Sequence, residues 1–210
     1  MNLQYYITSN CTISKHVIYK NEVPVFEHRV TDLPAFLLAA YQHLGLNYSK
    51  FYKMDNLCKL GWLASEVLLG GIDIKQYQPG EVGLVLSNAN SSLDSDQRYM
   101  QSVSDIPSPA LFVYTLPNIV IGEICIRHNF KGEDAFFIFE KFDATFIETY
   151  VNDLLNNDIL KACICGWVDV LGDDHKAVLF LVEKEEKSNA VPFSKRHMGT
   201  IFDNLVIDKI

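Results

Sequence analysis

The sequence predicts a single-domain α/β protein with a largely buried sheet. Apolar runs with the length and side chains of β-strands occur at three places, 82–86, 135–139 and 162–171. Helical segments are predicted before and between them, at 55–69, 119–128 and 143–156. Strands that alternate with helices along one chain indicate a layered α/β fold in which most of the sheet is covered.

The composition is that of a globular protein and argues against several functions. Hydrophobic residues make up 49% and charged residues 21% of the 210 residues, which is enough for a sizeable core. The net charge of −8 argues against nucleic acid and anionic membranes as partners, because both bind basic surfaces. No apolar run reaches the roughly 18 residues of a membrane span, and residues 1–10 lack a signal-peptide pattern. We therefore expect a cytoplasmic protein.

Capping residues predict further elements in the first third of the chain. Strands are expected at Gln4–Ile7 and Val23–His28. A helix is expected from Asp32, as its N-cap, to about His43. Asp55 begins the following helix, and the pair Gly70-Gly71 ends it.

The rest of the chain alternates in the same way. A Ser/Asn-rich loop at 87–92 precedes a short helix over Asp94–Val103, and Ile106–Pro109 is a breaker. Asp143 begins the amphipathic helix at 143–156. A last strand is predicted at Ala177–Val182, and a charged tail begins at Glu183.

The five cysteines give no sign of a disulfide framework or a metal site. Their number is odd, no CxxC pair exists, and a reducing cytoplasm disfavours disulfides. Cys163 and Cys165 share one face of a predicted strand, without a nearby histidine. We interpret both as small buried residues, and no cofactor or metal is predicted.

The most specific motifs lie in the middle of the chain. Residues 108–127 read SPALFVYTLPNIVIGEICIR, followed by HNFKGED. This segment resembles the part of the β-ketoacyl synthases in which a Pro-Asn pair precedes a helix, an Ile-Arg pair and a Lys-Gly turn. Residues 53–69 (KMDNLCKLGWLASEVLL) resemble the first long helix of that family, and 81–92 resemble the strand and Ser-rich loop after it.

The resemblance continues at 162–170, where the active enzymes carry a Gly-Gly pair and this chain has Cys165-Gly166-Trp167. It covers roughly residues 1–185 and leaves 186–210 as a divergent tail. It is closest to the short, divergent ketosynthase-like proteins of bacterial polyene and pigment gene clusters. The implied fold is a thiolase-like arrangement of α/β/α layers with a mixed sheet, of which this chain forms one half, the N-terminal ketosynthase half.

The resemblance also implies that the catalytic site is degenerate. Active members carry a cysteine in the turn between a buried strand and the next helix, where the helix N-terminus stabilises the thiolate that accepts the acyl group. Counting on from the Lys-Gly turn, that position is Lys141, flanked by Glu140 and Phe142. No cysteine lies within 131–158, and the second half of the family, with its two histidines, has no counterpart here. We therefore expect no condensation by this chain on its own.

Other candidate residues have alternative interpretations. Lys141 is either a solvated surface residue or an amine whose pKa the helix N-terminus lowers, so that it acts as a nucleophile or base. Glu123 and Arg127 are four residues apart on one helix and are expected to pair. Asp94 and Asp96 are expected to cap a helix rather than bind a cation.

Two surfaces are predicted to meet partner proteins. Family members dimerise through the strand before the nucleophile turn, here Ala135, Phe136, Phe137, Ile138 and Phe139. Pairing this apolar strand across a two-fold axis would remove an aggregation hazard. Acyl carrier proteins are acidic, and their candidate docking residues are Lys50, Lys53 and Lys59, or alternatively Lys195, Arg196 and His197.

The absent second half has a physical consequence. One side of the helix at 143–156 is then newly exposed or newly covered, and Phe142, Phe146 and Tyr150 contribute to an apolar patch there. We expect the tail from Pro192 to Ile210 to cover this patch.

Two functions of different classes follow. The first is a noncatalytic accessory subunit of fatty-acid or polyketide biosynthesis, of the aryl polyene or pigment type, as a homodimer or as a heterodimer with an active ketosynthase. The second is an acyl- or acyl-carrier-binding protein, or a residual acyltransferase that uses the degenerate site. A truncated gene product with little function of its own is a third alternative.

Overall fold

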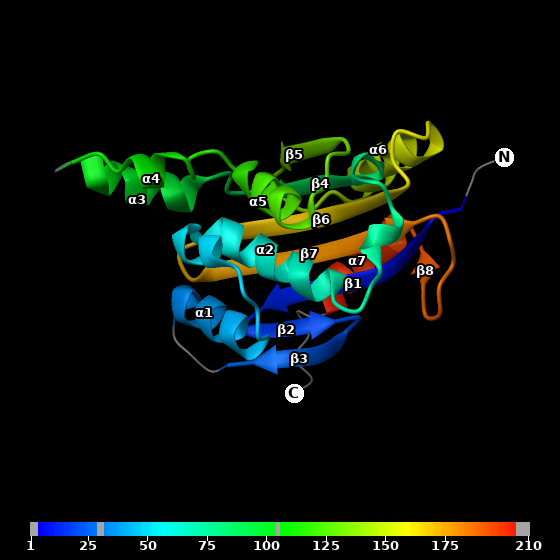
Figure 1. The fold of residues 1–210 in the computed structure, drawn as a ribbon, viewed down its shortest axis with the longest axis horizontal. Helices are drawn as coiled ribbons and strands as arrows, with labels where there is room; N and C mark the ends of the chain where they lie inside the picture. Colours follow the sequence, from blue (N-terminus) through cyan, green and yellow to red (C-terminus); the bar gives the residue numbers. More distant parts are fainter. Residues whose placement is uncertain (1–3, 29–31, 104–105, 205–210) are drawn as a thin grey trace.

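The computed structural model describes residues 4–28, 32–103 and 106–204, which form one eight-stranded mixed sheet with helices on both faces (Figure 1). In order across the sheet, the strands are β3 (Val23–Glu27), β2 (Val17–Lys20), β1 (Tyr6–Ser14), β7 (Asp174–Glu183), β6 (Ala162–Leu171), β4 (Val82–Asn88) and β5 (Asp134–Ile138). The short strand β8 (Val191–Pro192) pairs with β1 off this path.

The sheet joins a parallel part to an antiparallel part. Strands β5, β4 and β6 run parallel, whereas β7 is antiparallel to both β6 and β1. Strands β1, β2 and β3 form an antiparallel meander. The mixed sheet predicted from the sequence is therefore confirmed, and β7 links its two parts.

Helices cover the two faces in separate layers. One face carries α1 (Leu33–His43), α2 (Asn56–Leu69) and α5 (Ile119–His128), which share a core cluster with Cys11 and Ile13 of β1. The other face carries α6 (Ala144–Asn156) and α7 (Lys195–Asn204), which pack with Cys163 and Cys165 of β6. The predicted α/β/α layering is thus confirmed.

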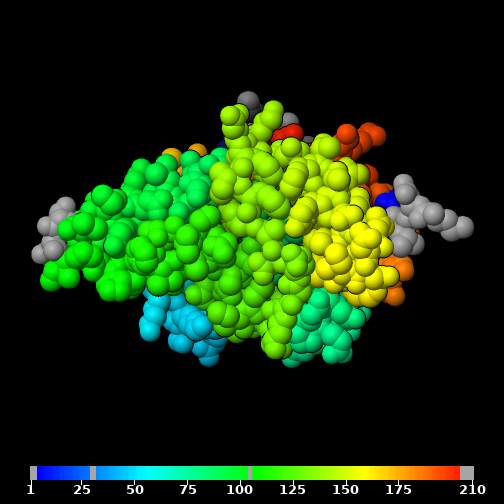
Figure 2. Space-filling model, turned by 90° about the horizontal axis from the view of Figure 1, so that it is seen from above, coloured from blue at the N-terminus to red at the C-terminus, as the bar shows by residue number. Residues whose placement is uncertain are grey.

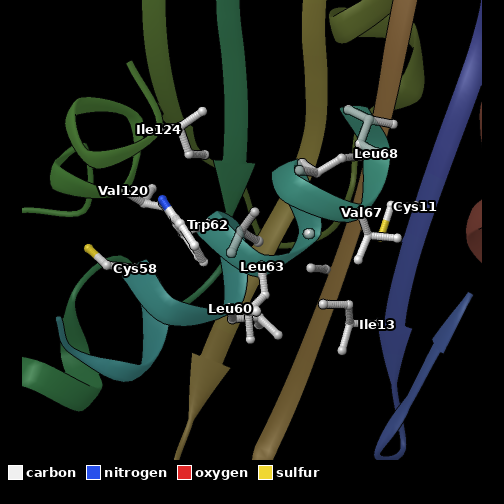
Figure 3. Packing of buried hydrophobic residues seen from close by; sticks show 14 of the residues in the cluster. Cys11, Ile13, Cys58, Leu60, Trp62, Leu63, Val67, Leu68, Val120 and Ile124 are labelled. Carbon is white, nitrogen blue, oxygen red and sulfur yellow. The ribbon is translucent and has the colours of Figure 1, made fainter. Parts of the chain in front are cut away.

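Helix α2 is the centre of the first layer, and nearly all of its residues are buried (Figure 3). Its N-cap is Asp55, whose carboxylate accepts a hydrogen bond from the backbone N–H of Cys58 at 2.8 Å. A methyl group on Gly61 would lie 2.4 Å from the side chain of Val120 in α5. The absence of a side chain at Gly61 therefore lets α2 and α5 approach closely.

The helices α3 (Leu93–Val103) and α4 (Pro109–Phe112) form an arm that extends beyond the ends of the strands, on the left of Figure 1. The apolar arm, residues 93–103 and 106–116, exposes large hydrophobic side chains: Leu93, Met100, Val103, Ile106, Phe112, Val113 and Leu116. Exposed apolar side chains that are concentrated in this way usually indicate a site of interaction with another molecule.

Two segments differ from the expected elements. The first strand extends to Ser14 rather than ending at Ile7, and it turns into β2, which was not predicted. Lys15 and His16 form this turn with positive φ angles of 50° and 60°. Tight hairpin turns usually place Gly or Asn at such positions, so a Lys-His pair gives no turn signal.

The second segment is the C-terminal tail, which contains the unpredicted helix α7. The short 3-10 segments at Ser49–Lys53, Ile74–Gln76 and Pro79–Glu81 complete the secondary structure. No helix among the described residues has the length and apolarity needed to cross a membrane.

Candidate functional site

The turn between β5 and α6 contains Lys141, as the sequence predicted. Asp143 caps α6 by accepting a hydrogen bond from the backbone N–H of Phe146 at 2.9 Å. The backbone N–H of Phe139 donates to the carbonyl of Asn88 at 2.9 Å, which ties the turn to the end of β4. The side chains of Glu140 and Lys141 are exposed. The turn thus has a strand–turn–helix geometry and presents the primary amine of Lys141 to solvent.

Helix α7 packs beside this turn. The ring of Phe142 stacks on that of Phe202 in α7, with centroids 4.6 Å apart. Met198 and Ile201 of α7 are buried in the same core cluster as α6. The Lys176 ammonium donates to the Phe202 carbonyl at 2.8 Å. Within the described part of the tail, α7 therefore covers Phe142 as expected, whereas the rings of Phe146 and Tyr150 pack against Phe137 of β5 instead.

An open cavity of about 630 Å³ lies at this turn. It is lined by residues Phe139 to Thr145 and by Lys195 and Arg196 of α7. In the sequence, Lys141 and the pair Lys195-Arg196 are separate candidates, and the structure places all three residues around one cavity. Helix α7 could have been predicted from the helical spacing of Met198, Ile201 and Phe202. Ser194 precedes this helix, and its hydroxyl accepts a hydrogen bond from the backbone N–H of His197 at 3.3 Å.

The cysteines are poor nucleophiles. Cys11, Cys58, Cys163 and Cys165 are buried, as expected for the last two, and Cys125 is partly buried. Burial raises the pKa of the Cys125 thiol to about 11 and raises the pKa of the other four thiols as well. Because the reactive species is the thiolate, these raised pKa values disfavour nucleophilic attack by the five thiols.

A buried carboxylate connects α2 to the apolar arm. Asp55 accepts hydrogen bonds from the Cys58 N–H at 2.8 Å and from the Ser95 hydroxyl at 2.5 Å. Burial raises the pKa of Asp55, although these two hydrogen bonds oppose the shift. Ser95 lies in α3, so Asp55 anchors the start of the arm to the N-terminus of α2.

Glu123 of α5 is a second carboxylate in this region. Its Oε2 atom is buried and has no hydrogen-bond partner among the described residues. Burial raises the pKa of Glu123, the Lys50 ammonium lowers it, and the neighbouring Asp55 raises it further. At neutral pH the ionised form is therefore less favourable in the folded protein than in the unfolded chain.

Replacing Glu123 with glutamine is expected to stabilise the protein at pH 7, by on the order of 0.5 kcal/mol because solvent screens this partly exposed group. A carboxyl group whose pKa is raised in the folded state destabilises the protein only when the pH is above the pKa of that group in the unfolded chain, which is about 4.3 for glutamate. The gain should therefore disappear as the pH falls toward that value. Thermal melts of E123Q, with E186Q at an exposed site as control, measure it. A less stable E123Q at pH 7 contradicts the prediction.

The prediction that Glu123 and Arg127 form an ion pair is wrong. Arg127 instead binds Glu66 of α2 through two hydrogen bonds of 2.8 and 3.1 Å, and it lies over the rings of Tyr48 and Trp62. Burial alone would raise the pKa of Glu66, but His128 and Arg127 lower it overall. The pairing joins two helices, so the spacing within α5 alone did not reveal it.

The acidic residues Asp94 and Asp96 have structural roles. Asp94 accepts a hydrogen bond from the Gly172 N–H at 3.0 Å, and Asp96 lies 3.3 Å from the Ser92 hydroxyl. The helix-capping role expected for them is not seen among the described residues, because both lie within the first turn of α3 and neither accepts a hydrogen bond from a backbone N–H of that helix. No group of three or more potential metal ligands occurs in the part of the chain that the structure describes.

The two basic clusters named in the sequence lie on opposite faces of the sheet. Lys50 and Lys53 are exposed on the 3-10 segment before α2, and Lys59 lies on α2 itself, 5.7 Å above the ring of Phe51. Burial and the neighbouring Arg98 lower the pKa of Lys59. Lys195 and Arg196 begin α7 on the other face. The two clusters therefore form separate surfaces.

The predicted dimerisation strand, Ala135–Phe139, coincides with β5 and the residue after it. It forms one end of the sheet, and only β4 pairs with it among the described strands. Phe136 packs toward the α2 layer and Phe137 toward the α6 layer, while Ile138 is 48% exposed. Its outer edge thus offers unpaired backbone groups beside apolar side chains.

Comparison with known proteins identifies the fold. One similar solved structure is the ishigamide ketosynthase/chain length factor, with a TM-score of 0.62 and 16% identity over 90% of this chain and 64% of that chain. Another is a type II polyketide synthase acyl-carrier protein in complex with its ketosynthase bound to the hexaketide, with a TM-score of 0.60 and 12% identity over 87% of this chain and 63% of that chain.

A third is a ketosynthase in complex with its chain length factor from Xenorhabdus doucetiae, with a TM-score of 0.56 and 13% identity over 87% of this chain and 80% of that chain. No protein-family model and no curated protein matches the chain. The chain spans less than two thirds of the length of the first two of these structures. These likenesses show that it has the ketosynthase-like, thiolase-type fold.

Proposed function

We propose that the chain is a cytoplasmic, noncatalytic ketosynthase-like subunit of polyketide biosynthesis, of the aryl polyene or pigment type, that pairs with an active ketosynthase. The observation that carries the proposal is the apolar strand β5 at the end of the sheet, next to the turn that contains Lys141. The similar structures of ketosynthases with chain length factors support it.

Strand pairing at β5 would satisfy the backbone groups on its outer edge. An unpaired apolar edge strand favours association with another chain, because its N–H and C=O groups and its side chains are both available. A second sheet that adds its own edge strand here would continue the sheet across the interface.

The apolar arm supplies the remaining contact area. Stable interfaces involve about 20–30 residues on each side, which a five-residue strand cannot provide alone. Figure 2 shows the residues of α3 to α5 and those of β5 and α6 side by side on one face of the molecule. A partner seated on β5 can therefore also extend over the apolar arm (Figure 2). An acyl carrier protein is a second proposed partner, at the exposed Lys50 and Lys53.

Replacing Ile138 with lysine is expected to abolish pairing with the ketosynthase. The side chain is 48% exposed in the single chain, so the change leaves the fold intact but places a charge in the interface. The tagged protein, purified from extract of its native cell, should bring down a ketosynthase at equal stoichiometry, as measured by mass spectrometry and light scattering. The amount of ketosynthase recovered with the I138K variant should be lower by at least about tenfold.

The matched control is Val23→Lys, at an exposed position on β3, the strand at the opposite end of the sheet. This variant should retain the ketosynthase. A wild-type chain that purifies alone as a monomer contradicts the proposal. Equal recovery with I138K and the wild-type chain contradicts the assignment of the interface to β5.

A further inference from the structure

Three cationic side chains from distant parts of the chain converge on the open cavity at the β5–α6 turn. Lys141 comes from the turn itself, and Lys195 and Arg196 come from the first turn of α7. All three are exposed, and none forms an ion pair with a residue that the structure describes. A chain with a net charge of −8 thus gathers three positive charges at one concave place.

The backbone adds donors at the same place. Helix α6 has 13 residues and begins at the cavity, so the positive end of its dipole faces there. The capping carboxylate of Asp143 takes the N–H of Phe146, whereas the N–H groups of Ala144 and Thr145 have no protein acceptor among the described residues. Both residues line the cavity. The cavity also lies beyond the carboxyl end of the parallel strand β5, where α/β proteins commonly bind ligands.

Two carboxylates line the cavity as well, Glu140 and Asp143. Asp143 is engaged in capping α6, and the three cations outnumber the two acidic groups. The start of α7 is held in place because the backbone N–H of Lys195 donates to Glu148 of α6 at 2.8 Å. The cationic side chains therefore extend from a fixed backbone.

We infer that this cavity binds the phosphate group of a small phosphorylated molecule. An arginine fork and two lysine ammonium groups, together with free N–H groups at a helix N-terminus, match the charge and the several acceptor oxygens of a phosphate. A volume of about 630 Å³ leaves room for an organic portion beside the phosphate. The inference does not depend on pairing at β5.

The test is a calorimetric titration of the purified full-length chain with inorganic pyrophosphate at low salt. The wild-type protein is expected to bind, and the double variant K141Q/R196Q is expected to bind at least about tenfold more weakly, because two charge-assisted contacts are lost. The control K75Q/K184Q removes the same charge at exposed lysines outside the cavity and should bind within about twofold of the wild type.

Thermal melts of both double variants verify that they are folded. Equal weakening in the two double variants would overturn the site, because it would show a response to net charge alone. Absence of pyrophosphate binding by the wild-type chain would also overturn it. Loss of binding confined to K141Q/R196Q supports it.

Discussion

Replacing Gly166 with alanine is expected to unfold the domain, or to destabilise it by more than about 4 kcal/mol. Gly166 lies within β6 with a φ of +146°, which side chains rarely allow. A methyl group would lie 2.0 Å from the carbonyl oxygen of Val178 and 3.2 Å from the Cα of Leu179. Both are backbone atoms of β7, so no flexible side chain can move aside, and the β6–β7 pairing must separate.

The matched control is Gly122→Ala in α5, where an added methyl group meets nothing within 4 Å. This change should stabilise the protein by up to about 1 kcal/mol, because alanine favours helix more than glycine does. Urea unfolding followed by the fluorescence of Trp62 and Trp167 measures both variants, and recovery of folded protein on expression gives a second readout. A G166A protein within about 1 kcal/mol of the wild type contradicts the expected clash.

Replacing Glu183 with alanine is expected to cost about 3–5 kcal/mol of stability. Its carboxylate is fully buried at the end of β7. It accepts hydrogen bonds from the Tyr77 hydroxyl at 2.8 Å, from the Lys187 ammonium at 2.6 Å and from the Thr8 hydroxyl. Removing the carboxylate takes the acceptor from the Tyr77 hydroxyl and the Lys187 ammonium, while the Thr8 hydroxyl keeps the Leu181 carbonyl at 3.4 Å. The change also leaves a cavity.

Glu185→Ala provides the comparison for this change. Glu185 is an exposed carboxylate two residues away, so its replacement should change stability by no more than about 0.5 kcal/mol. Urea unfolding at neutral pH separates the two variants. If E183A and E185A have similar stabilities, the buried network around Glu183 does not contribute as described.

The elements that were predicted best are those in which the apolar pattern of the sequence coincides with burial in the structure. The strand expected at 162–171 matches β6, whose residues are almost all buried. The helix expected at 143–156 matches α6, because its capping aspartate and apolar stripe both point to the same element. Lys141 falls in the predicted turn, since its position follows directly from these two neighbours.

Two features that were not predicted depend on contacts between distant segments. Arg127 has an acidic neighbour within its own helix, but its partner, Glu66, belongs to another helix of the same layer. The sequence indicated Lys195 and Arg196 only as part of an alternative docking cluster for a carrier protein, and the packing of α7 on α6 places them beside Lys141. The periodicity of a single helix carries no information about contacts between side chains of different elements.

The central place of β7 has a consequence for how the chain folds. Strand β1 precedes β7 by most of the described chain, but one of its edges pairs with β7, with Tyr6 opposite Glu183. The parallel strands β5, β4 and β6 reach the N-terminal meander only through β7. During synthesis the meander therefore keeps an unpaired apolar edge until β7 (Asp174–Glu183) has been made. Such long-range pairing favours slow folding and makes the nascent chain dependent on protection from aggregation.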